Sequence, residues 1–237
     1  HTIRSVGRAA PGRAGALTAL TAEIVECRAC PRLVAWREGV AREKRAAFRD
    51  ESYWGRPVPG FGDPAARVLI VGLAPAAHGG NRTGRIFTGD RSGDWLFGAL
   101  HRTGYSNQAT SVSADDGLEL RDAYVAAVVR CAPPANKPTT DERDRCLPYL
   151  VRELALLERV RVIVVLGKFA YDATARVLAT RGSPLPSPRP PFGHGVEVAS
   201  DRATVVGSYH PSQQNTFTGK LTESMIDDVF ARARALS

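Results

Sequence analysis

Four short apolar runs are the feature that most limits how this chain can fold. They lie at residues 68–73, 124–129, 161–166 and 203–208, and each is rich in valine or other small aliphatic residues. Runs of this length and composition are typical of buried strands. Segments of helical character separate them, and such alternation implies a mostly parallel sheet covered on both faces. The sequence therefore predicts a three-layer α/β/α sandwich with a central four-stranded, mostly parallel sheet.

The segments between these runs predict the helices. Asp90 is a candidate N-cap for a helix through Leu100, and Thr139 with Glu142 forms a candidate capping box. Helices are expected at residues 16–26, 90–100, 140–158, 167–179 and 221–236. Pro148 is expected to kink the third of them. Residues 31–66 are mixed, and residues 181–195 form a proline-rich loop. We expect residues 1–15 to be a flexible basic arm and residues 16–237 a single domain.

Composition restricts the class of protein. Hydrophobic residues make up 43% of the chain, enough for a packed core, and the formal net charge is +8. A basic surface attracts polyanions such as nucleic acids, although charge alone does not separate DNA from RNA or acidic small molecules. No apolar run approaches the roughly 18 residues of a membrane helix, and the first residues lack the apolar stretch of a signal peptide. We therefore expect a cytoplasmic protein that acts away from membranes.

Three unusual loops follow the predicted strands. They read "GLAPAAHGGNRTGR" at residues 72–85, "RCAPPANK" at 130–137 and "SYHPSQQN" at 208–215. The carboxyl ends of parallel strands meet at one edge of a sheet, where ligands bind in such folds. The first loop holds small residues and no acid, so it offers backbone N–H groups rather than a general base. A shared binding site at this edge is expected.

Four cysteines form a candidate metal site. Cys27 and Cys30 make a C-x-x-C pair, while Cys131 and Cys146 are more widely spaced. Four thiolates bind either zinc or a [4Fe–4S] cluster. The loose second pair, and Pro31 directly after Cys30, favour iron–sulfur. Ordinary buried thiols remain the alternative.

Taken together, these motifs resemble the uracil-DNA glycosylase superfamily, and within its iron–sulfur branch family 5, the type B enzymes. The matching pieces are "CRACP", "VLIVGLAPAAHGGNRTGRIFTGD", "VRCAPPANKP" and "GSYHPSQQN". The resemblance implies an α/β/α sandwich, a [4Fe–4S] cluster on the four cysteines, and a DNA partner. It also implies a monofunctional DNA glycosylase of base excision repair that hydrolyses the N-glycosidic bond of flipped uracil. We expect a monomer that acts at the bacterial nucleoid.

The resemblance gives individual residues roles. His210 would donate a hydrogen bond to the base oxygen on which negative charge grows, and Phe87 would stack on the base. The residues expected to bind the extruded base are Gly72, Leu73, Ala74, Phe87 and Asn215. Our candidates for positioning the attacking water are Asn81 and His78. The residues expected to contact DNA are Arg82, Arg85, Lys137, Gln213 and Gln214.

Two departures from related families bear on chemistry and substrate range. Many relatives place an acid or amide after the first strand to orient water, and this chain has Ala74. Relatives in family 4 carry an asparagine where this chain has Ala127, and losing that amide removes a filter against wrong bases. Hypoxanthine, xanthine and ethenocytosine are therefore expected besides uracil. Catalysis is expected to come from stabilising the departing anionic base.

Two other functions are compatible with parts of the sequence. A non-enzymatic, metal-containing DNA-binding module would explain the cysteines and the charge, but it would leave the glycine loop and "HPSQQN" without a role. A nucleotide-binding enzyme would use "GLAPAAHGG" as a phosphate loop. The Lys-Ser/Thr pair and the glycine spacing of the usual phosphate-binding loops are absent, which argues against this second alternative.

Overall fold

The computed structural model, which describes residues 13–237, is built on one six-stranded sheet with the strand order β1-β3-β2-β4-β6-β5. Its four central strands are parallel to one another. They are β2 (Val68–Gly72), β3 (Ala123–Ala127), β4 (Val162–Leu166) and β6 (Thr204–Ser208). These are the four strands that the apolar runs predict, so the α/β class and the parallel sheet are confirmed. Most of the expected N-terminal arm lies outside the described residues.

Two short antiparallel strands extend this sheet at its edges. β1 (Phe61–Gly62) pairs with β3, and β5 (Glu197–Ala199) pairs with β6. The sheet therefore has six strands rather than the expected four. The sequence signal was missing because each edge strand is very short and lacks a continuous apolar run.

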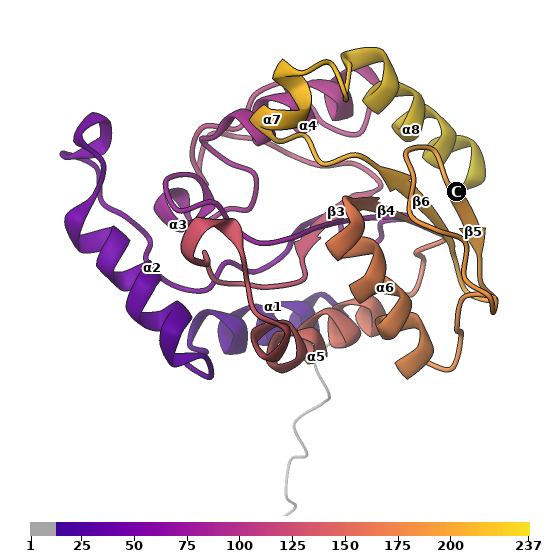
Figure 1. The fold of residues 1–237 in the computed structure, drawn as a ribbon, viewed down its shortest axis with the longest axis horizontal. Helices are drawn as coiled ribbons and strands as arrows, with labels where there is room; N and C mark the ends of the chain where they lie inside the picture. The colour runs from indigo at the N-terminus through magenta and orange to yellow at the C-terminus, as the bar shows by residue number, and fades with distance from the viewer. Residues whose placement is uncertain (1–12) are drawn as a thin grey trace, which may run out of the picture.

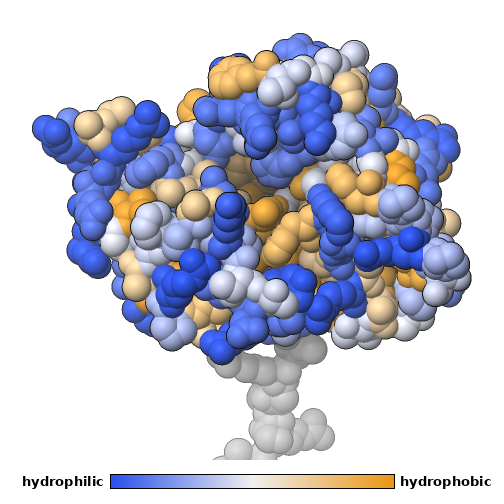
Figure 2. Space-filling model, viewed as in Figure 1, coloured by the Kyte–Doolittle hydropathy of each residue, from blue (hydrophilic) through white to orange (hydrophobic). Residues whose placement is uncertain are grey.

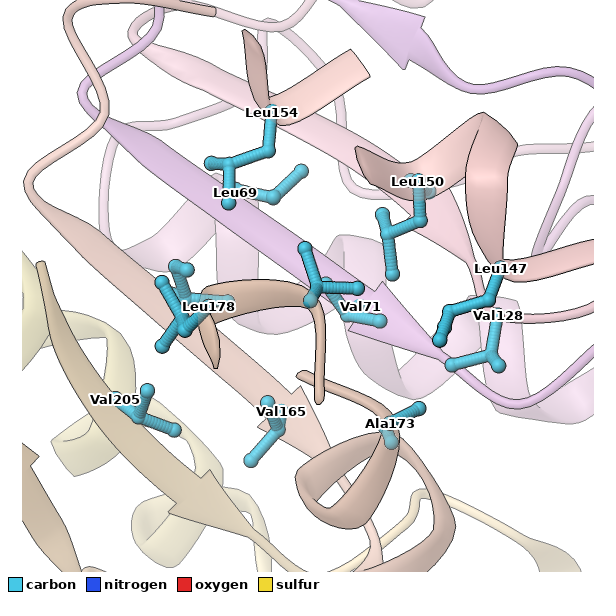
Figure 3. Close-up of a cluster of buried hydrophobic side chains, with 14 of the residues drawn as sticks. Leu69, Val71, Val128, Leu147, Leu150, Leu154, Val165, Ala173, Leu178 and Val205 are labelled. Atoms are coloured by element: carbon cyan, nitrogen blue, oxygen red, sulfur yellow. The ribbon is translucent and has the colours of Figure 1, made fainter. Parts of the chain in front are cut away.

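The two faces of the sheet are both buried, and side chains alternate between them. Leu69 and Val71 of β2 pack on one side with Leu150 and Leu178, as Figure 3 shows, while Val68 of the same strand joins the cluster on the other side. This period of two places every second residue on the same face. With both faces covered, a strand must be apolar throughout, which explains the uninterrupted runs in the sequence.

Helices cover these faces as two outer layers (Figure 1). One layer consists of α1 (Arg13–Val25), α5 (Thr140–Leu156) and α6 (Lys168–Thr180), and the other of α4 (Arg91–Arg102) and α8 (Glu223–Leu236). The expected caps are confirmed: the Asp90 side chain accepts a hydrogen bond from the Gly93 N–H, and Thr139 forms a capping box with Glu142. Pro148 lies inside α5, which continues to Leu156.

Three helices were not assigned from the sequence. They are α2 (Pro31–Glu43), α3 (Gly80–Thr83) and α7 (Gln213–Phe217), and short 3-10 turns occupy η1 (Ala46–Phe48) and η2 (Pro134–Asn136). α2 begins at Pro31, directly after Cys30, because proline suits the first helical position, where its missing N–H removes no helical hydrogen bond. In the part of the chain described here, no helix is both long enough and apolar enough to cross a bilayer.

Candidate active site

A cavity of about 830 Å³ opens at the carboxyl ends of the central strands. It is lined by Leu73 and Ala74 after β2, and by His210 after β6. β2 has parallel neighbours on both sides, β3 and β4, so the order of the strands reverses there, and such points form binding crevices. Figure 2 shows a hollow in this face with apolar side chains inside it and hydrophilic ones around it. Two of the three expected loops therefore meet at one site, and the third contributes Asn136.

The aromatic side of the cavity depends on two glycines. The ring of Phe87 lies so close to Gly72 that a Cβ there would stand 2.6 Å from the Phe87 Cζ. A Cβ on Gly93 would stand 1.8 Å from the Phe87 carbonyl oxygen. Phe87 itself has φ 54°, a strained backbone conformation for a residue with a side chain. These contacts hold the ring in place, and Phe87 lines the cavity from this position.

His210 lies beside this ring in the cavity lining. The centroids of the Phe87 and His210 rings are 5.9 Å apart at a tilt of 37°. Burial lowers the pKa of His210 to about 4, so the imidazole is neutral at pH 7. Asn215 does not line the cavity; its Nδ2 donates to the His210 carbonyl oxygen at 2.8 Å. The amide therefore braces the loop that carries the imidazole.

The two residues expected to position water occupy different places. His78 lines the cavity, and its Nδ1 lies 3.0 Å from the Tyr53 hydroxyl. Asn81 is fully buried, outside the cavity lining, and its Nδ2 donates to the carbonyl oxygen of Arg37 on α2 at 3.1 Å. The structure therefore leaves His78 as a water-binding candidate and gives Asn81 a contact between α2 and α3.

The two loop arginines expected to bind DNA point into the protein. Arg82 pairs with Glu51 and donates to the carbonyl oxygen of His78. Arg85 is 7% exposed and pairs with Asp116 at 2.7 Å. Neither lines the cavity, and both guanidinium groups are occupied in holding the glycine-rich loop. Sequence alone could not separate these buried arginines from surface ones.

The four cysteines line a second, smaller cavity. Cys27 and Cys30 lie between α1 and α2, Cys131 follows β3, and Cys146 lies in α5. None of them is in a disulfide. Within residues 13–237 no group of three or more His, Cys, Asp or Glu side chains is arranged to hold a single metal ion. The four thiols nevertheless lie around one cavity, as the sequence pattern predicts.

The polar groups around these thiols match an anionic centre. The Nη1 of Arg37 donates to the Cys131 Sγ at 3.0 Å, and the backbone N–H of Arg130 donates to the Cys146 Sγ at 3.3 Å. Arg37 is 2% exposed and its ion-pair partner, Glu38, is 3.8 Å away. A buried cation is costly beside neutral thiols, whereas thiolates would compensate its charge. Burial raises the pKa of Cys131 to about 11, and a metal that bound there would displace the thiol proton.

Comparison with known proteins identifies the family. A sequence model of the "Uracil DNA glycosylase superfamily" matches residues 59–234. The chain belongs to this superfamily. It is 55% identical to the type-5 uracil-DNA glycosylase of Mycobacterium leprae (strain TN), over 95% of this chain and 98% of the relative.

More distant relatives carry related names. The type-5 uracil-DNA glycosylase of Thermus thermophilus is 50% identical over 90% of this chain and 95% of its own length. A type-4 uracil-DNA glycosylase of Pyrobaculum aerophilum is 30% identical over 68% of this chain and 74% of its own length. The resemblance that the motifs indicated, to the type-5 branch of the uracil-DNA glycosylases, is thereby confirmed.

In this glycosylase-superfamily chain, three charged residues at the cavity were missed as site residues. Asp90 lines the cavity beside Gly79, where an added Cβ would stand 2.1 Å from the Asp90 Oδ2. Burial raises the pKa of the Asp90 carboxyl. Arg45 and Arg91, both exposed, also line the cavity. Asp90 was recognised only as a helix cap, and nothing in the local sequence distinguishes the two arginines from other surface arginines.

The remaining expected DNA contacts lie in two places. Gln213 and Gln214, on α7, line the cavity. Lys137 is exposed, and the cavity residue nearest to it in the chain is Asn136.

The first prediction concerns the protonation of His210. An NMR titration of its ring resonances, assigned with His210→Asn, is expected to give a pKa of about 4 because the imidazole is desolvated. The unfolded chain binds this proton at about 6.5, so His210 makes stability fall as the pH drops from about 6.5 toward the lowered pKa. A titration midpoint near 6.5 in the folded protein would contradict the burial of the ring.

Proposed function

We propose that this protein is a DNA glycosylase that hydrolyses the N-glycosidic bond of uracil extruded from DNA, as a step of base excision repair. The observation that carries the proposal is the pair of adjacent rings in the cavity lining, Phe87 held on Gly72 and the neutral His210 beside it. A base inside a duplex is inaccessible, so enzymes acting on it must enclose it in such a pocket. Phe87 offers a face for stacking, with Leu73 and Ala74 beside it.

His210 is proposed to stabilise the leaving base. When the glycosidic bond breaks, its electrons move onto the base and negative charge grows on a carbonyl oxygen. A hydrogen bond donated by a neutral imidazole in a dry pocket stabilises that charge, as in an oxyanion hole. A neutral imidazole keeps its N–H without needing a proton from solution, and burial of His210 maintains that state at pH 7.

Asp90 is proposed to act on the sugar side. As the base leaves, the sugar becomes electron-poor, and a nearby carboxylate stabilises it and orients the incoming water. Asp90 is the only acidic residue lining the cavity among residues 13–237. Its carboxyl is also fixed, because its Oδ1 accepts from the Gly93 N–H at 3.0 Å. Asp90 would thus orient the water, which the glycine-rich loop cannot do because it contains no acidic residue. His78 is proposed as a second contact for the water.

The DNA backbone is proposed to lie across the cavity mouth. Arg45 and Arg91 are the exposed cations on its lining, and they take the phosphate-binding role expected of Arg82 and Arg85. Lys137 remains a candidate for a phosphate farther along the strand. Gln213 and Gln214 are placed to enter the space left by the extruded nucleotide. One chain contains every proposed group, so we propose that the protein acts on DNA as a monomer. Its proposed place of action is the nucleoid in the cytoplasm, where the DNA lies.

The four cysteines are proposed to hold a [4Fe–4S] cluster. The support is the set of four unpaired thiols around one cavity and the buried guanidinium of Arg37 beside them. When bound, the cluster supplies an anionic, structural cross-link. The residues themselves explain what it would hold together: Cys30 immediately precedes α2, Cys131 follows β3, and Cys146 belongs to α5.

The substrate range is proposed to extend beyond uracil, to hypoxanthine, xanthine and ethenocytosine. Ala127 ends β3 and is the register partner of Gly72. It offers no side-chain hydrogen bond at the position where family 4 carries an amide. Without that amide, no polar group is left unpaired when a base other than uracil enters the cavity, so such a base is not rejected there. No lysine lines the cavity among the described residues, which supports a monofunctional hydrolase.

The second prediction tests the function itself. His210→Ala is expected to slow uracil excision by about 10²–10³-fold, the usual effect of losing one oxyanion-hole donor. Binding to DNA that carries uncleavable 2′-fluoro-deoxyuridine should change little, because the hydrogen bond strengthens as charge develops. Excision is measured by alkaline cleavage of abasic sites, with His101→Ala, outside the cavity lining, as the matched control.

Two outcomes of this assay separate the alternatives. A native protein that binds DNA but leaves uracil in place would favour the non-enzymatic module. Equal losses of binding and excision in His210→Ala would assign His210 to docking. Duplexes containing hypoxanthine, xanthine or ethenocytosine, used in the same assay with the native protein, test the wider range.

The third prediction concerns Asp90. Asp90→Asn keeps an oxygen for the Gly93 N–H but removes the charge, so excision should fall about 10²–10⁴-fold, the usual effect of losing a catalytic acid or base. Since burial raises the pKa of Asp90, native activity should decline as the pH falls through that raised pKa, and the variant should lack this limb. Asp94→Asn, exposed in the same helical turn, is the control. Full activity in Asp90→Asn would exclude a carboxylate role.

The fourth prediction concerns the metal. Protein purified without oxygen is expected to be brown and to contain about four irons per chain, as a [4Fe–4S] cluster requires. Cys146→Ser should lose iron, whereas Tyr149→Phe, which changes the same cavity without removing a thiol, should retain it. Stoichiometric zinc in a colourless protein would overturn the cluster assignment.

A further inference from the structure

Helix α7, which contributes Gln213 and Gln214 to the cavity lining, also carries an exposed aromatic ring without an assigned role. Phe217, the last residue of α7, is 66% exposed, the largest exposure among the exposed large hydrophobic residues in the described part of the chain. The exposed Trp54, by contrast, donates its indole N–H to the Pro57 carbonyl oxygen. Figure 2 shows an apolar patch at the upper edge of the molecule, where Figure 1 draws α7.

Arg91 supports this ring from one side. Its guanidinium carbon lies 4.3 Å from the centroid of the Phe217 ring, a cation–π contact. Arg91 is the first residue of α4 and lines the cavity. Arg91 is exposed, so its charge is available to a phosphate. One face of the ring is thus held by a cation, while most of its surface faces solvent.

The ring is also fixed relative to the cavity. α7 begins after Ser212, whose side chain accepts from the Asn215 N–H, and ends where the Thr218 hydroxyl donates to the Gln214 carbonyl oxygen at 2.7 Å. The same short helix places Gln213 and Gln214 on the cavity lining. Phe217 therefore stands next to the residues proposed to enter the duplex, on an element whose loop is tied to His210.

We propose that Phe217, backed by Arg91, stacks on a nucleobase that loses its neighbour when the damaged nucleotide is extruded. This inference rests on the proposed function. Extrusion leaves an unpaired partner base and unstacked flanking bases, and an aromatic side chain stacks on any of them because every base has a π face. A phenylalanine has no hydrogen-bonding group, so the contact holds the opened DNA without reading its sequence.

A nucleobase explains the surroundings of the ring better than an apolar protein partner does. The cation behind the ring and the basic lining formed with Arg45 repel basic surfaces and attract phosphate. The ring also packs on Arg91, which lines the cavity that the DNA must cover during excision. A nucleotide can contact both side chains at once, because its base stacks on Phe217 while its phosphate pairs with Arg91.

The test uses duplexes with uncleavable 2′-fluoro-deoxyuridine and the fluorescent base 2-aminopurine. The fluorophore is placed opposite the uracil or on either side of it. Native protein is expected to quench 2-aminopurine at one of these positions, because stacking on an aromatic ring quenches it, and Phe217→Ala should abolish that quenching. Phe217→Trp should restore it, and Trp36→Ala, an exposed aromatic on α2, should behave as the native protein does.

Kinetics provide the second readout. Under single-turnover conditions Phe217→Ala is expected to slow excision from a duplex about tenfold, with Phe217→Trp near the native rate. If the effect vanishes on single-stranded DNA, the stacked base is the orphaned partner; if it persists, the base is a neighbour in the same strand.

Two negative results have separate meanings. Native protein that fails to excise uracil would overturn the proposed function. Native excision together with a Phe217→Ala variant indistinguishable in fluorescence and rate would overturn only the stacking platform.

Discussion

The close contact between the Phe87 ring and Gly72 is the constraint on which the site depends. Gly72 ends a buried central strand, so the Phe87 ring packs directly against the sheet. The contact also requires the unusual backbone of Phe87 and the missing side chain of Gly93. Gly72, Phe87 and Gly93 therefore fix one wall of the cavity, and His210 and Asp90 lie next to that wall.

Burial then sets the protonation of the polar groups in opposite senses. It lowers the pKa of His210 and raises the pKa of Asp90, because in each case water is no longer present to stabilise the charged form. The result is an imidazole that stays neutral and a carboxylate that is a stronger base than a solvated one. Pairs of titratable groups shifted in this way are typical of sites that handle charge on two sides of one breaking bond.

Sequence reasoning was most successful where periodicity and position decide the outcome. The four buried strands follow from uninterrupted valine-rich runs, and the caps at Asp90 and Thr139 follow from local hydrogen-bond chemistry. The grouping of four cysteines could be predicted because their number and spacing suit one site. Edge strands β1 and β5 could not, since pairing with a neighbour, rather than their own composition, makes them strands.

The arginines mark the limit of such reasoning. Arg82 and Arg85 belong to a loop that resembles a binding loop, yet carboxylates from distant segments pair with both of them. Arg45 and Arg91 attract no attention in the sequence and reach the cavity only through the way α2 and α4 are placed. Whether an arginine is buried in an ion pair or free to bind a ligand depends on residues that are remote along the chain. A local sequence pattern does not identify those residues.

The helix α2 connects the cavity lined by the four cysteines with the larger cavity at the strand ends. It starts directly after Cys30, receives the Asn81 amide at the Arg37 carbonyl oxygen in its middle, and leads to Arg45 at the cavity. A helix transmits displacement along its axis as a stiff rod. The backbone of α2 consequently carries a displacement of the thiol end toward the segment that lines the larger cavity.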